Sequence, residues 1–124
     1  MLKLEQIQNI KKAEKVIFTT VNNDQPRSIW VIPSRVESDH IILSNIQMNK
    51  SIENIKNNPK CFINVLLPDE DDLQYKIEGL AKNYSSGALF EEIKSFEETE
   101  NLPPELKVHS IIVIQLTSVE ESNG

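Results

Sequence analysis

Apolar residues recur every three or four positions in three stretches of the chain and alternate with polar residues through much of the rest. The helical spacing occurs over residues 2–13, 48–57 and 86–99. It places the apolar side chains on one face of a helix. Three short amphipathic helices are therefore predicted. The second should end at Asn58-Pro59, because a residue before proline is pushed out of the helical region, and Ser85 or Ser86 should cap the third.

Six further stretches are rich in β-branched and aromatic residues, a composition typical of strands. These strands are predicted at residues 15–21, 27–36, 40–44, 60–67, 73–84 and 109–119. Asn22-Asn23-Asp24 supplies a tight turn between the first two strands. Pro33 cannot donate a ladder hydrogen bond, so the second strand is expected to bend there. The tail after residue 119 is expected to fray.

The connections between these strands are too short for the long crossovers that parallel pairing requires. A mostly antiparallel sheet follows, in which residues 27–36 pair with 40–44 and residues 60–67 with 73–84. Six strands in a chain of 124 residues tend to curl shut, which removes exposed edges. We therefore predict a mostly β fold with short helices, in which a small closed barrel of six antiparallel strands forms a single domain over residues 1–124.

The net charge of the chain limits its partners. Its formal value is −6 at pH 7, whereas nucleic-acid and anionic-membrane surfaces need dense Lys and Arg patches. No nucleic-acid and no membrane partner is expected, and a nucleic-acid-binding barrel ranks last among the function classes. The N-terminus has no signal-peptide pattern, and no apolar run reaches the roughly 18 residues of a membrane span. A soluble, cytoplasmic protein is expected.

Cysteine and histidine are too few for a disulfide framework or a zinc site. The chain has one cysteine, Cys61, and two histidines, His40 and His109. Their spacing matches no metal-ligand pattern, so no metal is expected. Cys61 lies in an apolar strand pattern and is interpreted as a buried small hydrophobe rather than a nucleophile.

The start of the second helix has the parts of an anion site. A strand leads through residues 45–49 into Lys50 and Ser51, where free backbone N–H groups and the positive end of the helix dipole meet. Lys50 adds a full charge, so a phosphate is the expected guest. Two other interpretations stay open from these residues alone. Lys50 can instead pair with Glu53 on the helix surface, and Ser51 can be a helix cap.

Several short segments, taken together, resemble one family. They are Pro26-Arg27-Ser28-Ile29-Trp30-Val31-Ile32, Ile42-Leu43-Ser44-Asn45, Asn49-Lys50-Ser51, Asn58-Pro59, Gln74 to Gly79, and Ser86-Gly87-Ala88-Leu89-Phe90-Glu91. In order and spacing they resemble the FMN-binding split barrels related to pyridoxamine 5'-phosphate oxidase, and in length the chain is similar to the small FMN-binding proteins of that superfamily. The resemblance spans roughly residues 10–119. It implies a six-stranded antiparallel split β-barrel that forms a homodimer and binds FMN.

The resemblance also implies a cofactor site at the interface between two copies. Arg27 and Lys50 would bind the FMN phosphate, Ser44 and Ser51 would donate hydroxyl hydrogen bonds, and Gln74 would reach the flavin ring from the second subunit. The complete implied site comprises Arg27, Ser28, Ile29, Trp30, Val31, Ile32, Leu43, Ser44, Asn49, Lys50, Ser51 and Gln74. No catalytic residue is assigned. Read without the resemblance, Arg27 is a solvated residue at a strand start, and Trp30 is core or interface packing.

Departures from the oxidase pattern point away from that enzyme's reaction. Ile32 stands where the pattern has a lysine, Asn49 stands at a basic position, and the Arg-x-His that holds the pyridoxal phosphate substrate is missing after the last strand. The leading hypothesis is an FMN-dependent oxidoreductase or electron carrier with a small-molecule or protein redox partner. The alternative is a non-enzymatic binding or regulatory barrel that holds a deazaflavin, haem or a nucleotide.

Overall fold

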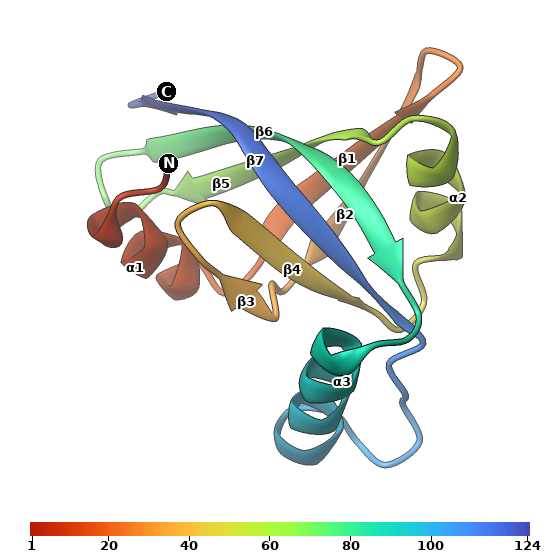
Figure 1. Ribbon diagram of the computed structural model, residues 1–124. Helices are drawn as coiled ribbons and strands as arrows, with labels where there is room; N and C mark the ends of the chain where they lie inside the picture. Colours follow the sequence, from red (N-terminus) through yellow and green to blue (C-terminus); the bar gives the residue numbers. More distant parts are fainter.

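A single curled sheet of seven antiparallel strands, with three helices around it, forms the body of the protein (Figure 1). The computed structural model describes every residue, Met1–Gly124. In chain order the elements are α1 (Leu4–Lys12), β1 (Val16–Asn22), β2 (Gln25–Val31), β3 (Arg35–Val36), β4 (His40–Asn45), α2 (Asn49–Asn57), β5 (Lys60–Leu67), β6 (Leu73–Tyr84), α3 (Ala88–Glu100) and β7 (Ser110–Ser122). None of the helices is long and apolar enough to cross a membrane.

The strand order is β2-β1-β5-β6-β7-β4-β3, so β2 and β3 form the two edges. The predicted strand over residues 27–36 is therefore two strands, one at each edge, and the prediction of six strands in a closed barrel is wrong. Pro33 explains the break, because it has no N–H and the next N–H, of Ser34, donates to the carbonyl of Ile42 on β4 (2.8 Å). The chain leaves one edge of the sheet at this proline and joins the other.

The short connection between β2 and β3 forces the sheet to curl. Val31 ends β2 and Arg35 begins β3, and four residue steps of extended chain span at most about 14 Å. The two edges therefore lie close together without forming a ladder. The result is an antiparallel sheet that is curled like a barrel but remains open along a seam between β2 and β3.

Strands β4 and β7 are apolar on both faces because one hydrophobic cluster packs on each face of the sheet there. The larger cluster, of 19 buried residues, fills the inside of the curl and includes Phe18, Ile41 and Ile77. The smaller one, of five, lies between the outer face and α3 and includes Ile42 and Phe90. Neighbouring residues in a strand point to opposite faces, so the consecutive pair Ile41-Ile42 serves both clusters.

Helices α1 and α2 lie at opposite ends of the sheet (Figure 1), and each is held by one buried hydrogen bond. The amide of Asn9 on α1 donates to the hydroxyl of Tyr75 on β6 (2.8 Å). The amide of Asn54 on α2 donates to the hydroxyl of Thr20 on β1 (3.0 Å). Because both pairs are buried, loss of one partner would leave the other unsatisfied. These bonds fix where the two helices meet the sheet.

Helix α3 differs from its sequence-based description. Gly87, not a serine, precedes its first residue, and its φ of 106° is a conformation that favours glycine. Of the predicted apolar face, Phe90 and Ile93 are buried whereas Leu89 and Phe96 are exposed. The helix therefore packs on the sheet with a narrow stripe and leaves one aromatic side chain free.

The C-terminal tail is part of the sheet. Strand β7 continues to Ser122, which pairs with Gln74 on β6, so the prediction of a frayed tail after residue 119 is wrong. Cys61 is fully buried, as expected for a core residue, and burial raises the pKa of its thiol to about 12. The neutral thiol is therefore the form present near neutral pH.

We expect Gly79→Ala to destabilise the fold by roughly 1–3 kcal/mol, the usual range for overpacking. A bulge follows Glu78 on β6, and a Cβ on Gly79 would lie 2.5 Å from Cγ2 of Ile114 and 2.8 Å from the carbonyl oxygen of Gln115. Urea denaturation would measure the change, with Leu80→Ala at an exposed neighbouring position as the control. A Gly79→Ala protein as stable as the control would contradict this close packing.

Candidate functional site

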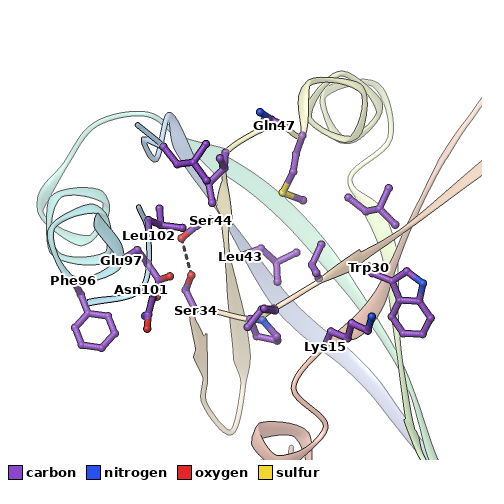
Figure 2. Close-up of a pocket in the computed structure, with 17 residues that line it drawn as sticks. Lys15, Trp30, Ser34, Leu43, Ser44, Gln47, Phe96, Glu97, Asn101 and Leu102 are labelled. Atoms are coloured by element: carbon purple, nitrogen blue, oxygen red, sulfur yellow. Dashed lines mark hydrogen bonds between the residues drawn. The ribbon is translucent and has the colours of Figure 1, made fainter. Parts of the chain in front are cut away.

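A cavity of about 850 Å³ lies along the seam between β2 and β3 (Figure 2). Its size falls within the usual range of ligand pockets, about 300–1,000 Å³. Five parts of the chain meet there: the residue before β1, the end of β2 with the connection to β3, the end of β4 with the loop after it, the end of α3, and the loop that follows α3. The lining residues are Lys15, Ile29, Trp30, Val31, Ile32, Pro33, Ser34, Leu43, Ser44, Ile46, Gln47, Met48, Phe96, Glu97, Asn101, Leu102 and Leu106.

Most of the cavity wall is apolar. Ten of its 17 lining residues are hydrophobic, which suits a flat aromatic or other apolar ligand. Leu43 is buried, whereas Trp30 (58% exposed), Ile32 (74%) and Phe96 (54%) are accessible to solvent. Exposed apolar side chains clustered at one place on a soluble protein mark a surface that meets a ligand or another chain.

One side of the cavity is polar. The hydroxyls of Ser34 and Ser44 are 2.6 Å apart, and the amide of Asn101 donates to Oε1 of Glu97 (3.3 Å). Figure 2 shows these four side chains grouped between β4 and α3. Burial raises the pKa of Glu97, and hydrogen bonding from Asn101 and Ser34 opposes part of the rise. A carboxyl group with this shift binds protons more readily than an exposed glutamate.

The opposite side of the cavity carries a positive charge. The ammonium of Lys15 lies 5.1 Å from the centroid of the Trp30 ring, a distance typical of cation–π contacts. Figure 2 places Lys15 and Trp30 on the side away from Glu97 and Asn101. The cavity thus has a cationic aromatic side and an acidic amide side.

The structure brings half of the predicted cofactor residues to this cavity. Those that line it are Ile29, Trp30, Val31, Ile32, Leu43 and Ser44. The other six, which are Arg27, Ser28, Asn49, Lys50, Ser51 and Gln74, lie outside its lining. They fall into three places: the middle of β2, the start of α2, and the start of β6.

Arg27 lies on the inner face of β2, toward α2. It pairs with Thr20 on β1, and residues directly opposite in an antiparallel pair share a face. Thr20 accepts a hydrogen bond from Asn54 of α2, so Arg27 faces the same side. Ser28 is on the other face, where its hydroxyl lies 2.8 Å from that of Thr19.

The first turn of α2 has unpartnered backbone donors. The N–H of Met48 donates to Oδ1 of Asn45 (2.8 Å), whereas the N–H groups of Asn49, Lys50 and Ser51 have no partner in the chain. Lys50 forms no ion pair, so the alternative pairing with Glu53 is not present. Ser51 is buried as the third residue of the helix and is not its cap.

Gln74 lies away from the cavity. It is the second residue of β6 and pairs with Ser122 near the end of β7. Within one chain Gln74 therefore does not reach the seam cavity. The contact with the flavin ring that the resemblance implies for Gln74 requires a second copy of the chain.

Sequence reasoning predicted Ser44 but missed Ser34, Glu97 and Asn101 on the polar side of the cavity. Glu97 sits in an acidic run that is typical of a solvated helix face. One signal was available, because Phe90, Ile93 and Glu97 are spaced by three and four residues and so lie on one helix face. A carboxylate that continues an apolar stripe indicates a polar group placed in a pocket or at a packed boundary.

The loop after α3 is held in place by Glu98. Its carboxylate accepts hydrogen bonds from the ammonium of Lys94 and from the backbone N–H of Val108 (2.8 Å), and the ammonium of Lys107 is 3.9 Å away. Lys94 and then the Val108 N–H hold the pKa of Glu98 below its ordinary value of 4.5. This contact closes the loop that brings Leu102 and Leu106 to the cavity.

We expect Glu98→Gln to lower stability at pH 7 but not at low pH. A carboxyl whose pKa is lowered by folding stabilises the protein above its unfolded value, and this contribution is lost as pH falls through the folded value. The difference in urea midpoint between wild type and variant should therefore be present at pH 7 and vanish well below pH 4.5. Glu100→Gln, at an exposed position, is the control. A difference that persists unchanged at low pH would contradict a role for the charge.

The fold and the cavity place the protein among small antiparallel β proteins that have a ligand-sized cavity at the seam of an incompletely closed sheet. The chain then matches the pyridoxamine 5'-phosphate oxidase family over residues 4–123. It belongs to this family. The resemblance inferred from the segments around Arg27, Lys50 and Gln74 is therefore confirmed at the level of the family.

Individual relatives agree with this assignment. An uncharacterised protein of Methanocaldococcus jannaschii is 31% identical over 94 residues, which are 75% of this chain and 58% of that protein. The chain thus spans less than two thirds of the length of this relative. The solved structure of HupZ from Group A Streptococcus has a TM-score of 0.84 at 17% identity, covering 100% of this chain and 96% of that one.

An FMN-binding protein from Syntrophomonas wolfei subsp. wolfei has a TM-score of 0.74 at 18% identity, covering 95% of this chain and 84% of that one. At these identities the two solved structures show the shared fold. Together with the family match they show that the chain has the fold of the pyridoxamine 5'-phosphate oxidase family.

Proposed function

We propose that the protein binds FMN between two copies of the chain and acts as an oxidoreductase or electron carrier. The observation that carries this proposal is the seam cavity. Its walls come from Ile29 to Ile32, Leu43 and Ser44, the residues for which the family resemblance implies flavin contacts. The apolar walls suit an isoalloxazine ring, and the adjoining start of α2 suits a phosphate.

The phosphate end of the proposed site lies beside the cavity. Three free backbone N–H groups at the start of α2 point away from the helix, and Lys50 is exposed and unpaired. Arg27, on the face of β2 that looks toward α2, adds a second positive charge. Backbone donors and two cations together offset the charge of a phosphate. Ser44, whose hydroxyl already meets that of Ser34, would add a hydrogen bond from the cavity side.

A second copy of the chain would complete the site. Trp30, Ile32 and Phe96 leave apolar surface exposed at the cavity, and Gln74 lies too far along β6 to reach the ring from its own chain. Closed two-fold dimers are the commonest soluble homo-oligomers. The mass in solution by light scattering tests this, and a monomer in the presence of FMN would remove the dimer from the proposal.

The bound flavin would supply electron transfer in one-electron or two-electron steps. The chain itself would orient the ring with the backbone of residues 29–32, hold the phosphate at α2, and keep water from the apolar wall formed by Leu43 and its neighbours. Ile32, exposed at the rim, offers no charge to a substrate phosphate. Oxidation of pyridoxine phosphate is therefore not part of the proposed function.

We expect FMN to bind the purified protein and raise its melting temperature, because a ligand that binds only the folded state stabilises it by mass action. Quenching of flavin fluorescence would measure the dissociation constant, with riboflavin as the control that lacks the phosphate. No quenching and no thermal shift would contradict FMN binding.

Turnover distinguishes the enzyme from the binding module. If FMN binds but is not reduced and reoxidised faster than free flavin, with NADH or NADPH as donor, the binding module is favoured. Binding of a deazaflavin, haem or a nucleotide in place of FMN would identify that module's ligand.

We expect Lys50→Ala to weaken FMN binding by roughly 1–3 kcal/mol, the scale for losing a charge-assisted hydrogen bond. Riboflavin binding should be unchanged, because it has no phosphate to contact. Lys56→Ala, in the last turn of the same helix, is the matched control and should leave the FMN dissociation constant as in wild type. Equal FMN affinity in both variants would remove Lys50 from the site.

A further inference from the structure

The side chain of Glu97 gives the cavity a property that the flavin site does not require. It lies on the wall formed by the last turn of α3, across from Lys15 (Figure 2). Its position is fixed on two sides. Phe90 and Ile93, on the same helix face, are buried against the sheet, and the Asn101 amide binds Oε1. Helix packing therefore places Glu97 at the cavity, and Asn101 orients its carboxylate.

No cation of the chain neutralises this carboxylate. The nearby positive groups are engaged elsewhere: Lys94 binds Glu98 and the Val108 carbonyl, and Arg35 pairs with Glu92 (3.0 Å). Glu97 itself forms no ion pair. The Asn101 amide and the Ser34 hydroxyl donate to this carboxylate, but both donors are neutral. A cation or a further donor from outside the chain would therefore stabilise the half-buried charge more.

The charge of Glu97 itself disfavours anions on this side of the cavity. Glu97 is the charged residue of α3 in the cavity lining, whereas Glu92 pairs with Arg35 and Glu98 pairs with Lys94 and Lys107. An anionic group brought to this side of the cavity would meet like charge in a partly desolvated site, where repulsion is stronger than in water. Hydroxyls of Ser34 and Ser44 add neutral polar groups beside the carboxylate.

We propose that this cavity binds a second ligand beside the flavin. That ligand is an uncharged or cationic molecule with an apolar body and an amine or hydroxyl group that donates to Glu97. The flavin as neighbour rests on the proposed function. The recognition rests on the cavity alone: apolar walls hold the body, Glu97 accepts from the donor, and Asn101 orients the carboxylate. Molecules that carry a carboxylate or phosphate at this end are excluded.

Three probes that share one ring system test this selection: 2-naphthylmethylamine, 2-naphthylmethanol and 2-naphthoate. Their dissociation constants are measured by calorimetry at pH 8 with the full chain, with and without FMN. We expect the amine to bind about tenfold more tightly than the alcohol, as one charge-assisted hydrogen bond allows, and the carboxylate to bind most weakly. Glu97→Gln should bring the amine to the affinity of the alcohol. Glu100→Gln, on the same helix outside the cavity lining, should keep the wild-type order.

The wild-type order alone can overturn the proposal, whether or not the Glu97→Gln protein folds. Tightest binding by 2-naphthoate, equal binding by all three probes, or binding by none would do so, as would a Glu97→Gln protein that keeps the amine preference. The two proposals fail separately. If the protein does not bind FMN but prefers the amine, the proposed function is wrong and the ligand selection by Glu97 stands. If it binds FMN but prefers the carboxylate, only the ligand selection is wrong.

Discussion

The three residues between β2 and β3 constrain the sheet more than any other connection, because they join strands at its opposite edges. Pro33 has no N–H, and Ser34 already donates to Ile42 on β4, so the ladder of β2 ends here. The sheet must curl until the edges are close, yet no hydrogen bonds close the gap. The apolar core fills the inside of the curl, and the open seam becomes the site of the cavity.

An open seam needs walls, and α3 with its following loop supplies one of them. Phe90 and Ile93 pack with Ile42 and Ile111 on the outer face of the sheet, which sets the position of the helix. Glu98 then ties the returning chain at Val108 to that helix. The same contacts that cover the sheet therefore place polar groups beside the cavity. The buried residues of α3 fix the helix on the sheet, and the last turn of the same helix lines the cavity.

The proposed cofactor site divides between two kinds of structure. The ring would meet the apolar seam, where the walls are largely fixed by the core. The phosphate would meet the start of α2, where free N–H groups and Lys50 are exposed. The inner face of β2 connects the two, since Arg27, Ile29 and Val31 alternate on one side of that strand. Because β2 is an edge strand, the backbone N–H and C=O groups on its outer side have no strand partner.

Sequence patterns, with the family resemblance, predict most of the elements and six of the residues that line the cavity. Alternation and helical spacing located the three helices and nearly all strand residues, because each element must bury one face. The missing N–H of Pro33 predicts a bend, and the order of short motifs indicates the family. The flavin contacts of Ser28 to Ile32 are implied by that resemblance and stay a prediction. Local chemistry suffices for the elements and the bend, since a proline or a helix start acts through its own backbone.

Three features come from long-range contacts alone: residues 27–36 form two strands at opposite edges, the barrel stays open, and β7 extends to Ser122. The tertiary structure also brought Glu97 and Asn101 from α3 to Ser34 and Ser44. These outcomes depend on which strands pair and how far the sheet curls, and both are set by contacts between residues distant in the chain. A glutamate in an acidic run looks solvated in sequence. Its place on the wall of a cavity follows from the packing of Phe90 and Ile93, on the same face of α3, against the sheet.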